Sequence, residues 1–248
     1  MHQEIKPRTK ILVFKDTERI STKVAQILQE LKTYPKHQPI HIALSGGNTP
    51  KAIFKILHEK YVTELAGNRF HFWWGDERCV SPDHDESNFK WAYTYWLKPI
   101  GIPEANIHRI HGENDPDEEI IRYSEEMKKW IKTENAMPRF DVIFLGLGDD
   151  GHTASIFPSQ MQLLDRKEWC AVATHPASGQ KRITLTGNVL NNARQVVFIS
   201  TGTNKAAIIK KIVIDEAPEF PASHIKPVDG ETVWLIDEEA ASKLPSLS

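Results

Sequence analysis

The stretch FDVIFLGLGDDGHTASIFP, from Phe140 to Pro158, decides how the rest of the chain is interpreted. Its first six residues form a short apolar run, which is typical of a strand buried on both faces of a parallel sheet. The glycines that follow allow a sharp turn or the close approach of a ligand. HTASIF is expected to begin a helix that Pro158 stops early. Because ligands of open α/β sheets bind at the carboxyl ends of the strands, this stretch predicts a site there.

Apolar runs and helical patterns alternate along the whole chain, which predicts βαβ units and a mainly parallel sheet flanked by helices. The expected strands are KILVF, PIHIAL, RFHFWW, FDVIFL, AVATHP, RITLT, QVVFIST and TVWLID. The expected helices cover residues 17–31, 50–60, 88–97, about 116–133 and 203–213. A loop at 35–39 and a frayed tail at 242–248 complete the pattern. One α/β domain over residues 1–248 is the simplest organisation, with a small helical lobe within 84–135 as an option.

Two helices have clear start signals. The first follows Asp16 and Thr17, either of which can cap it, and its apolar residues recur at helical spacing. The second follows SGGNTP, where Thr49 is expected to be the N-cap and Pro50 the first helical residue, a position at which the missing N–H costs nothing.

Composition excludes several classes of protein. The chain has 248 residues, a net charge of −2 and 40% hydrophobic residues, so neither nucleic acid nor a membrane surface is an expected partner. The two cysteines, Cys79 and Cys170, are too few for a disulfide framework, which favours a reducing compartment. The N-terminal residues lack an apolar signal region, and no run of about 18 apolar residues occurs. These features predict a cytoplasmic enzyme or binding protein.

SGGNTP, residues 45–50, joins an expected strand to a helix start. Its glycines let backbone N–H groups approach an anion, and the helix dipole favours negative charge there. The GK[ST] of a P-loop is missing, so a nucleoside triphosphate is not expected. An ordinary tight turn and a phosphate site both remain open from spacing alone.

GLGDDG, residues 146–151, formally matches the dinucleotide fingerprint GxGxxG. Charge argues against that interpretation, because Asp149 and Asp150 would lie beside the pyrophosphate and repel it. Pro158 also cuts short the crossover helix that the fingerprint requires.

Asp150 and His152 together suggest acid–base chemistry, because a histidine beside a carboxylate has a fixed tautomer and suits a general base. Considered alone, His152 is better explained as a capping residue at a helix N-terminus than as a catalyst. Asp76 and Arg78 can equally form a surface ion pair. Both clusters follow apolar runs, however, and therefore belong at one sheet edge. No zinc-type histidine spacing occurs, so no metal is expected.

Several motifs together resemble the glucosamine-6-phosphate isomerase/6-phosphogluconolactonase family: LSGGNTP, WGDERCVSPDHDESNF, FLGLGDDGHTASIFP, RITLT and GTNKA. They occur in the family's order and span residues 45–205. The resemblance implies a Rossmann-like, glucosamine-6-phosphate deaminase-like fold. It also implies hydrolysis of a sugar-phosphate lactone, 6-phospho-D-glucono-1,5-lactone, in the pentose phosphate pathway, without metal or cofactor, by a monomer or small homo-oligomer.

The resemblance also assigns roles residue by residue. His152 is the implied general base, with Asp76 and Asp150 as the acids. The remaining implied residues bind phosphate or line the pocket: Ser45, Gly46, Gly47, Asn48, Thr49, Arg182 and Lys205 at the phosphate, and Arg78 and Ser155 in the pocket. The loop before RITLT reads ASGQK where many members carry prolines, so the contact made by Arg182 stays open.

Two alternatives remain. The deaminases of the family have a glutamate where this chain has Phe157, and a phenyl ring cannot transfer the proton that opens an aminosugar ring. A non-catalytic sugar-phosphate sensor would keep the phosphate loop and dispense with the acids and His152.

Overall fold

The structure is a computed structural model that describes residues 8–35, 38–65, 67 and 69–245. The expected loop at 35–39 and tail at 242–248 therefore lie partly outside the described residues. Six parallel strands form the main sheet, in the order β1–β11–β10–β7–β2–β3. Their bounds are Arg8–Phe14 (β1), Ile40–Leu44 (β2), Phe70–Trp74 (β3), Val142–Leu145 (β7), Gln195–Ser200 (β10) and Glu231–Asp237 (β11). The predicted mainly parallel α/β fold is confirmed.

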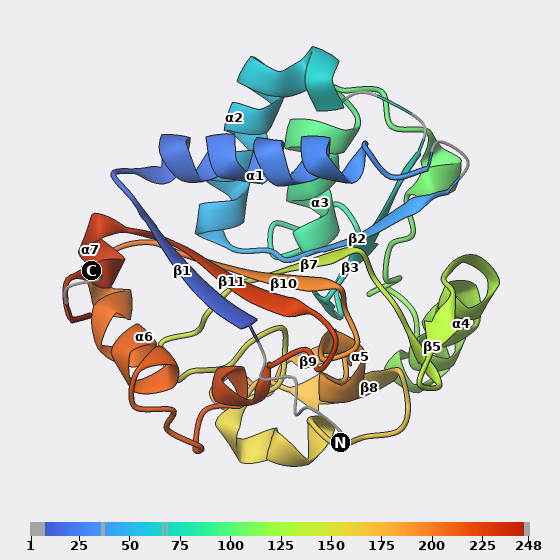
Figure 1. Cartoon of the computed structure of the whole chain (residues 1–248). Coiled ribbons are helices and arrows are strands. Elements are labelled where there is room, and N and C mark those ends of the chain that lie inside the picture. The colour runs from blue at the N-terminus through green and yellow to red at the C-terminus, as the bar shows by residue number, and fades with distance from the viewer. Residues whose placement is uncertain (1–7, 36–37, 66, 68, 246–248) are drawn as a thin grey trace, which may run out of the picture.

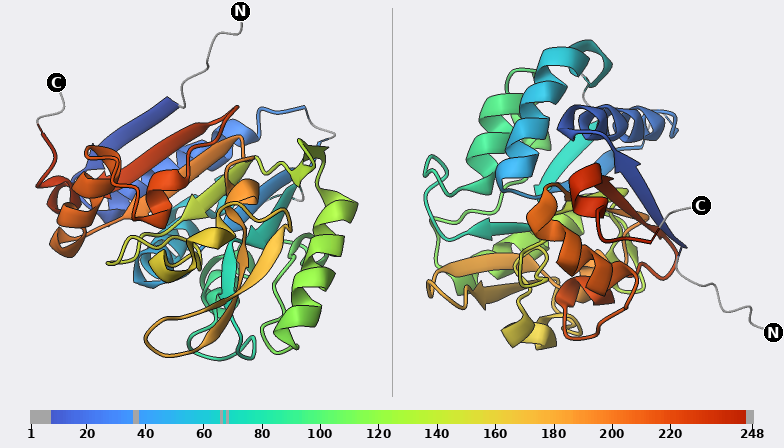
Figure 2. Two further views of the ribbon diagram at one scale, coloured as in Figure 1. Left: turned by 90° about the horizontal axis from the view of Figure 1, so that it is seen from below. Right: turned by 90° about the vertical axis from the view of Figure 1, so that its left-hand side faces the viewer.

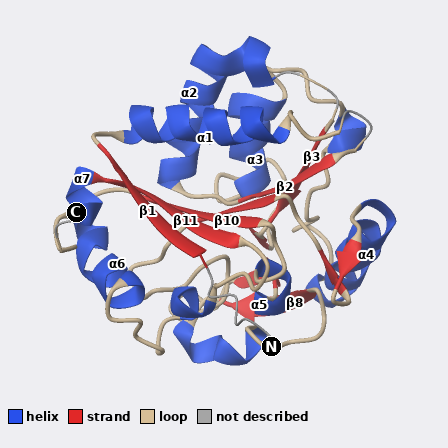
Figure 3. Ribbon diagram, viewed as in Figure 1, coloured by secondary structure: helices blue, strands red, loops and turns tan. Residues whose placement is uncertain are grey.

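Helices cover both faces of this sheet (Figure 1; Figure 3). One face carries α1 (Thr17–Leu31), α2 (Asn48–Leu65) and α3 (Asn88–Ala92), which continues into a π-helical turn, Tyr93–Leu97. The other face carries α6 (Ala206–Val213) and the short α5 (Gly187–Leu190), while α7 (Glu238–Ala241) follows β11. Buried apolar side chains of the strands and helices join in one hydrophobic cluster.

Helix α1 shows why the local patterns hold. The Asp16 carboxylate accepts a hydrogen bond from the backbone N–H of Arg19 at 2.9 Å, which satisfies one of the free donors at the helix start. Ile20, Val24 and Leu28 share the face that is buried against the sheet. The predicted cap and apolar stripe are confirmed.

A second, antiparallel sheet lies below the main one (Figure 2) and was not predicted. It consists of β4 (Asp76–Arg78), β9 (Lys181–Leu185) and β8 (Cys170–Thr174) in that order. Helix α4 (Pro116–Trp130), capped by Asp115, packs against β8. A two-stranded hairpin of β5 (Thr133–Glu134) and β6 (Met137–Pro138) follows α4. The register of β4 places Arg78 opposite Arg182, which brings two distant cations together.

The expected helix at HTASIF is wrong. The backbone of Ala154 has a φ of 47°, and Thr153 and Ile156 pair in an isolated antiparallel bridge, so this segment is a compact turn. The Thr153 hydroxyl donates to the carbonyl of Gly146 at 2.9 Å and ties the turn to the end of β7. Pro158 starts a 3₁₀ helix, Pro158–Leu163, where it was expected to stop an α-helix.

The expected cap of α2 is also displaced. The helix begins at Asn48, so Thr49 lies inside its first turn and is not the N-cap. The Thr49 hydroxyl instead hydrogen-bonds the Thr201 hydroxyl at 2.9 Å, which links α2 to the end of β10. The Thr49 side chain, which the local pattern predicted to cap the helix, therefore makes a tertiary contact.

Candidate active site

A cavity of about 500 Å³ opens at the carboxyl ends of the central parallel strands. The loops after β2 and β7 form its walls, and these neighbouring strands mark the place where the chain's progression across the sheet reverses. That reversal is the usual location of a ligand in open α/β sheets. The lining residues are Ser45, Gly46, Gly47, Asn48, Thr49, Pro50, Asp76, Arg78, Asn88, Gly146, Leu147, Gly148, His152, Ala154, Arg182, Ile199, Ser200, Thr201, Asn204 and Lys205.

His152 lines this cavity and is paired with Asp150. Its Nδ1 lies 2.6 Å from Asp150 Oδ1, and its backbone N–H donates to the same oxygen at 3.1 Å. Partial burial opposes ionisation of Asp150, but the hydrogen bonds from His152 outweigh it and lower the pKa of the carboxyl. An ionised partner at Nδ1 keeps the proton on that nitrogen, so Nε2 carries the lone pair.

Gly148 and Phe157 determine where the imidazole lies. A Cβ at residue 148 would fall 2.1 Å from His152 Nδ1, so only glycine leaves room for the ring. Phe157 is fully buried, and its ring centroid lies 4.8 Å from that of His152. The Phe157 ring also lies 5.8 Å from the guanidinium carbon of Arg182.

Asp76 also lines the cavity, but within the described residues it forms no hydrogen bond or ion pair with His152. Its Oδ2 accepts the Ser155 hydroxyl at 2.6 Å, and its Oδ1 accepts the Asn88 side-chain N–H at 3.3 Å. The sequence left open which acid orients His152, and the geometry assigns that contact to Asp150. Ser155 is fully buried and is not among the residues that line the cavity, so its expected role in the pocket stays a prediction from the sequence. It lies behind Asp76 because the turn at 153–156 points its side chain inward.

Two arginines form one wall. Arg78 and Arg182 pair across β4 and β9, and each has a buried Nε atom without a hydrogen-bond partner among the described residues. Burial and the neighbouring Arg78 lower the pKa of Arg182. Neither guanidinium has a carboxylate within ion-pair distance in the described part of the chain. Two adjacent cations that form no ion pair within the described residues favour the binding of an anion in the cavity beside them.

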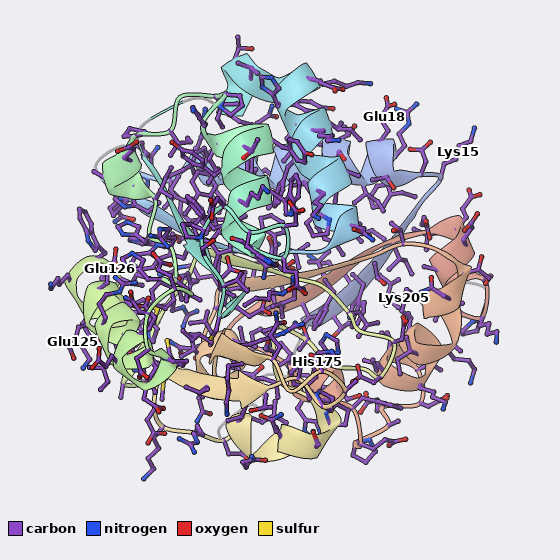
Figure 4. The ribbon with its side chains drawn as sticks, turned by 180° about the vertical axis from the view of Figure 1, so that it is seen from behind. Lys15, Glu18, Glu125, Glu126, His175 and Lys205 are labelled. Carbon is purple, nitrogen blue, oxygen red and sulfur yellow. The ribbon has the colours of Figure 1, made fainter. Side chains whose placement is uncertain are left out.

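The turn after β2 and the start of α2 form another part of the lining. Ser45 to Thr49 line the cavity there, and the first N–H groups of the helix lack intrahelical partners. Lys205, at the end of the 3₁₀ turn Thr203–Lys205, donates to the Leu147 carbonyl at 2.8 Å and pairs with Asp149. Figure 4 marks Lys205 beside the loops of this edge.

Asn88 and Asn204 also line the cavity, and sequence reasoning missed both. Asn88 follows a polar loop and opens α3, where it resembles an ordinary helix-start residue capped by Ser87. The only sequence signal for its position is the pair of acids, Asp76 and Glu77, eleven to twelve residues earlier in the chain. Asn204 donates to Asp149 at 3.2 Å, and no local pattern distinguishes it from a loop amide.

At this edge of the α/β sheet, the cavity is lined by an imidazole paired with a carboxylate, by two arginines and by a lysine, a set of groups that is typical of enzymes acting on small anionic molecules. The family model described as glucosamine-6-phosphate isomerases/6-phosphogluconolactonase matches residues 15–234. The chain therefore belongs to this family, as its motifs predicted.

The relatives agree in sequence and fold. A 6-phosphogluconolactonase of Haemophilus influenzae is 41% identical over 225 residues, covering 89% of this chain and 95% of the relative. A solved 6-phosphogluconolactonase of Trypanosoma brucei superposes with a TM-score of 0.86 at 27% identity, covering 96% of this chain and 100% of that one. A monomeric glucosamine-6-phosphate deaminase shares the fold, with a TM-score of 0.79 at 21% identity over 94% of this chain and 99% of that one.

Proposed function

We propose that this protein hydrolyses 6-phospho-D-glucono-1,5-lactone to 6-phosphogluconate, the lactone-opening step of the pentose phosphate pathway. The observation that carries the proposal is the His152–Asp150 pair, which lines the same cavity as the SGGNT turn and Lys205. The curated relatives named 6-phosphogluconolactonase support the choice of substrate.

The phosphate binds at Ser45–Thr49 with Lys205 and Arg182. A dianion offsets the desolvation of the two cations, and its anchoring holds the lactone ring at a fixed place. Arg182 is nine-tenths buried and lies in the wall beside Arg78. Asp76, held by Ser155 and Asn88, accepts a hydrogen bond from a hydroxyl of the sugar.

His152 Nε2 removes a proton from water, and the water oxygen forms a bond to the lactone carbonyl carbon. The carbonyl oxygen becomes an oxyanion, which Arg78 stabilises from the cavity wall. The tetrahedral intermediate then collapses, the bond from carbon to the ring oxygen breaks, and His152 returns its proton to that oxygen. Asp150 stabilises the imidazolium between the two transfers.

The alternative, deamination of glucosamine 6-phosphate, is disfavoured by Phe157. This side chain is fully buried against His152, where the deaminases of the family have an acid. A sensor without catalysis would not need the oriented His152–Asp150 pair.

One assay tests these alternatives. Fresh 6-phosphogluconolactone should be hydrolysed faster with the protein than without it, and glucosamine 6-phosphate should release no ammonia. The reverse outcome, ammonia without accelerated lactone hydrolysis, would favour the deaminase.

Lys205→Ala tests the phosphate subsite. Removing a cation that binds a dianion should raise KM by about tenfold or more and leave kcat nearly unchanged. Lys210→Ala is a matched control, because Lys210 of α6 forms an ion pair with Asp215 and is not among the residues that line the cavity. A fall in kcat with constant KM would contradict the assignment of Lys205.

The remaining features stay predictions from the sequence: a cytoplasmic location, and a monomer or small homo-oligomer that needs no metal or cofactor. No helix in the described ranges is long and apolar enough to cross a bilayer.

A further inference from the structure

Asn88 lies between two parts of the cavity lining, Asp76 and Gly46. It is 3% exposed, lines the pocket, and opens helix α3. Its side-chain nitrogen donates to the Asp76 backbone carbonyl at 3.0 Å and to Asp76 Oδ1 at 3.3 Å. Both partners can only accept, so the amide nitrogen must face Asp76 and the amide oxygen must face the other way.

The amide oxygen of Asn88 faces the phosphate loop. A Cβ built on Gly46 would lie 1.7 Å from this oxygen, so the Asn88 side chain fills the space that a larger residue at 46 would occupy. One amide therefore fits between the Asp76 carboxylate and the SGGNT turn.

Glu77 holds the backbone at Asn88 in place through hydrogen bonds. Its carboxylate accepts the backbone N–H groups of Asn88 and Phe89, each at 2.8 Å, and the Ser87 hydroxyl at 3.1 Å. Glu77 is 3% exposed. The adjacent acids of β4 thus have different tasks: Asp76 faces the cavity, and Glu77 anchors the segment that returns Asn88 to Asp76.

We propose that Asn88 is a positioning residue for the reaction: its amide holds the Asp76 carboxylate in the orientation that receives the sugar hydroxyl. The inference rests on the proposed function and deepens it, because the family resemblance assigned no role to Asn88. It acts through Asp76, so its effect should disappear once Asp76 is removed.

A double-mutant cycle measures this dependence. Asn88→Ala should lower kcat/KM for the lactone by about 10- to 100-fold, since it removes a hydrogen bond to a charged group. Asp76→Ala should cause a larger loss, and Asp76→Ala/Asn88→Ala should match Asp76→Ala within about threefold. Losses that multiply, or an Asn88→Ala enzyme within threefold of wild type, would overturn the inference.

Asn192→Ala is the matched control. Asn192 is a 9% exposed asparagine whose amide donates to three backbone carbonyls, those of Glu134, Met137 and Pro138, away from the cavity. Its loss should lower the unfolding temperature and leave kcat/KM within threefold of wild type. A drop in kcat/KM equal to that of Asn88→Ala would show that loosened packing alone explains both.

Asn88→Asp gives a second readout with nearly the same shape, which also serves if Asn88→Ala does not fold. Two carboxylates at this distance share one proton, and the protonated form donates to Asp76 as the amide does. Glu77, Arg78, Arg182 and His152 also face this region, and they are common to all variants. Activity relative to wild type should therefore rise at least tenfold from pH 8 to pH 5.

A flat ratio between these pH values would overturn the inference, because an ionised carboxylate at residue 88 cannot donate to Asp76, whereas a protonated one can. Wild-type protein without lactonase activity would overturn the proposed function itself and the inference with it. An active wild type with independent effects at Asp76 and Asn88 would overturn the inference alone.

Discussion

Among the described residues, two histidine–carboxylate pairs have nearly equal lengths: one lines the cavity, and the other is buried beside β3 and α4. His152 Nδ1 lies 2.6 Å from Asp150, and His108 Nδ1 lies 2.7 Å from Glu126 of α4. Figure 4 shows Glu126 and Lys205 on opposite sides of the molecule. The His152 side chain is 26% exposed, whereas that of His108 is 3% exposed.

The second ring nitrogen distinguishes the pairs. His108 Nε2 hydrogen-bonds His71 Nδ1 at 2.9 Å, and the ring stacks on Trp73 at 4.0 Å between centroids. Both nitrogens of His108 are therefore used within the protein. His152 Nε2 has no such partner in the described part of the chain, and the ring lines the cavity. A carboxylate partner orients an imidazole, but only a free nitrogen beside a substrate makes it a base.

Of these substitutions, His152→Ala should have the largest effect, and that effect should be on catalysis. We expect kcat to fall by about 10²–10⁴-fold, because general base catalysis is lost, while KM and the unfolding temperature change little. Steady-state kinetics on fresh lactone, corrected for spontaneous hydrolysis, measure the change. A kcat near that of wild type would remove His152 from the mechanism.

His108→Ala should have the opposite profile. Removing a buried ring that stacks on Trp73 and joins His71 to Glu126 should lower the free energy of unfolding by roughly 2–4 kcal/mol. The kcat/KM of the folded protein should remain within about threefold of wild type. Denaturant unfolding and kinetics on the same preparation test this, and a selective loss of activity would connect the buried pair to catalysis.

Asp150→Asn tests the same difference between the two pairs with a smaller expected effect on kcat. The amide can still contact His152 but cannot stabilise the imidazolium, so we expect kcat to fall by about 10–100-fold. Glu126→Gln is the control, because the same change at the buried pair should leave kcat unchanged. Equal effects on kcat in the two variants would contradict the separation of roles.

Acid should destabilise the folded protein through two buried histidines, His41 and His71. Burial lowers the pKa of His41 to about 3 and that of His71 to about 4, below their unfolded value near 6.5. The unfolded chain then binds more protons than the folded one, so stability falls as pH drops below 6.5. We expect a loss of roughly 3 kcal/mol between pH 6.5 and 5, about half of it from each histidine.

Unfolding midpoints at pH 7, 6 and 5 measure this loss. His71→Phe should flatten the dependence, because one of the two titrating groups is absent. A stability that rises on acidification would contradict the sign.

Much of the fold could be predicted because its signals are local. Buried parallel strands are continuous apolar runs, and α1 shows its Asp16 cap and its apolar stripe in the sequence. The turn at 153–156 could not be predicted from local pattern. Its backbone conformation depends on the hydrogen bond from the Thr153 hydroxyl to the Gly146 carbonyl and includes a positive φ at Ala154. β4 has only three residues, and its partner β9 lies about a hundred positions away.

The sequence by itself determined the sheet, the family, and the motifs that hold His152, Asp150, the SGGNT turn and Lys205, because each is a contiguous run with its own chemistry. Only the tertiary structure decided how these residues pair. It placed Asp150 and not Asp76 on His152, buried Ser155 behind Asp76, and brought Asn88 between Asp76 and Gly46. The reason is physical: a hydrogen bond depends on distances of about 3 Å between atoms, and those distances are fixed by the packing of segments far apart in the chain.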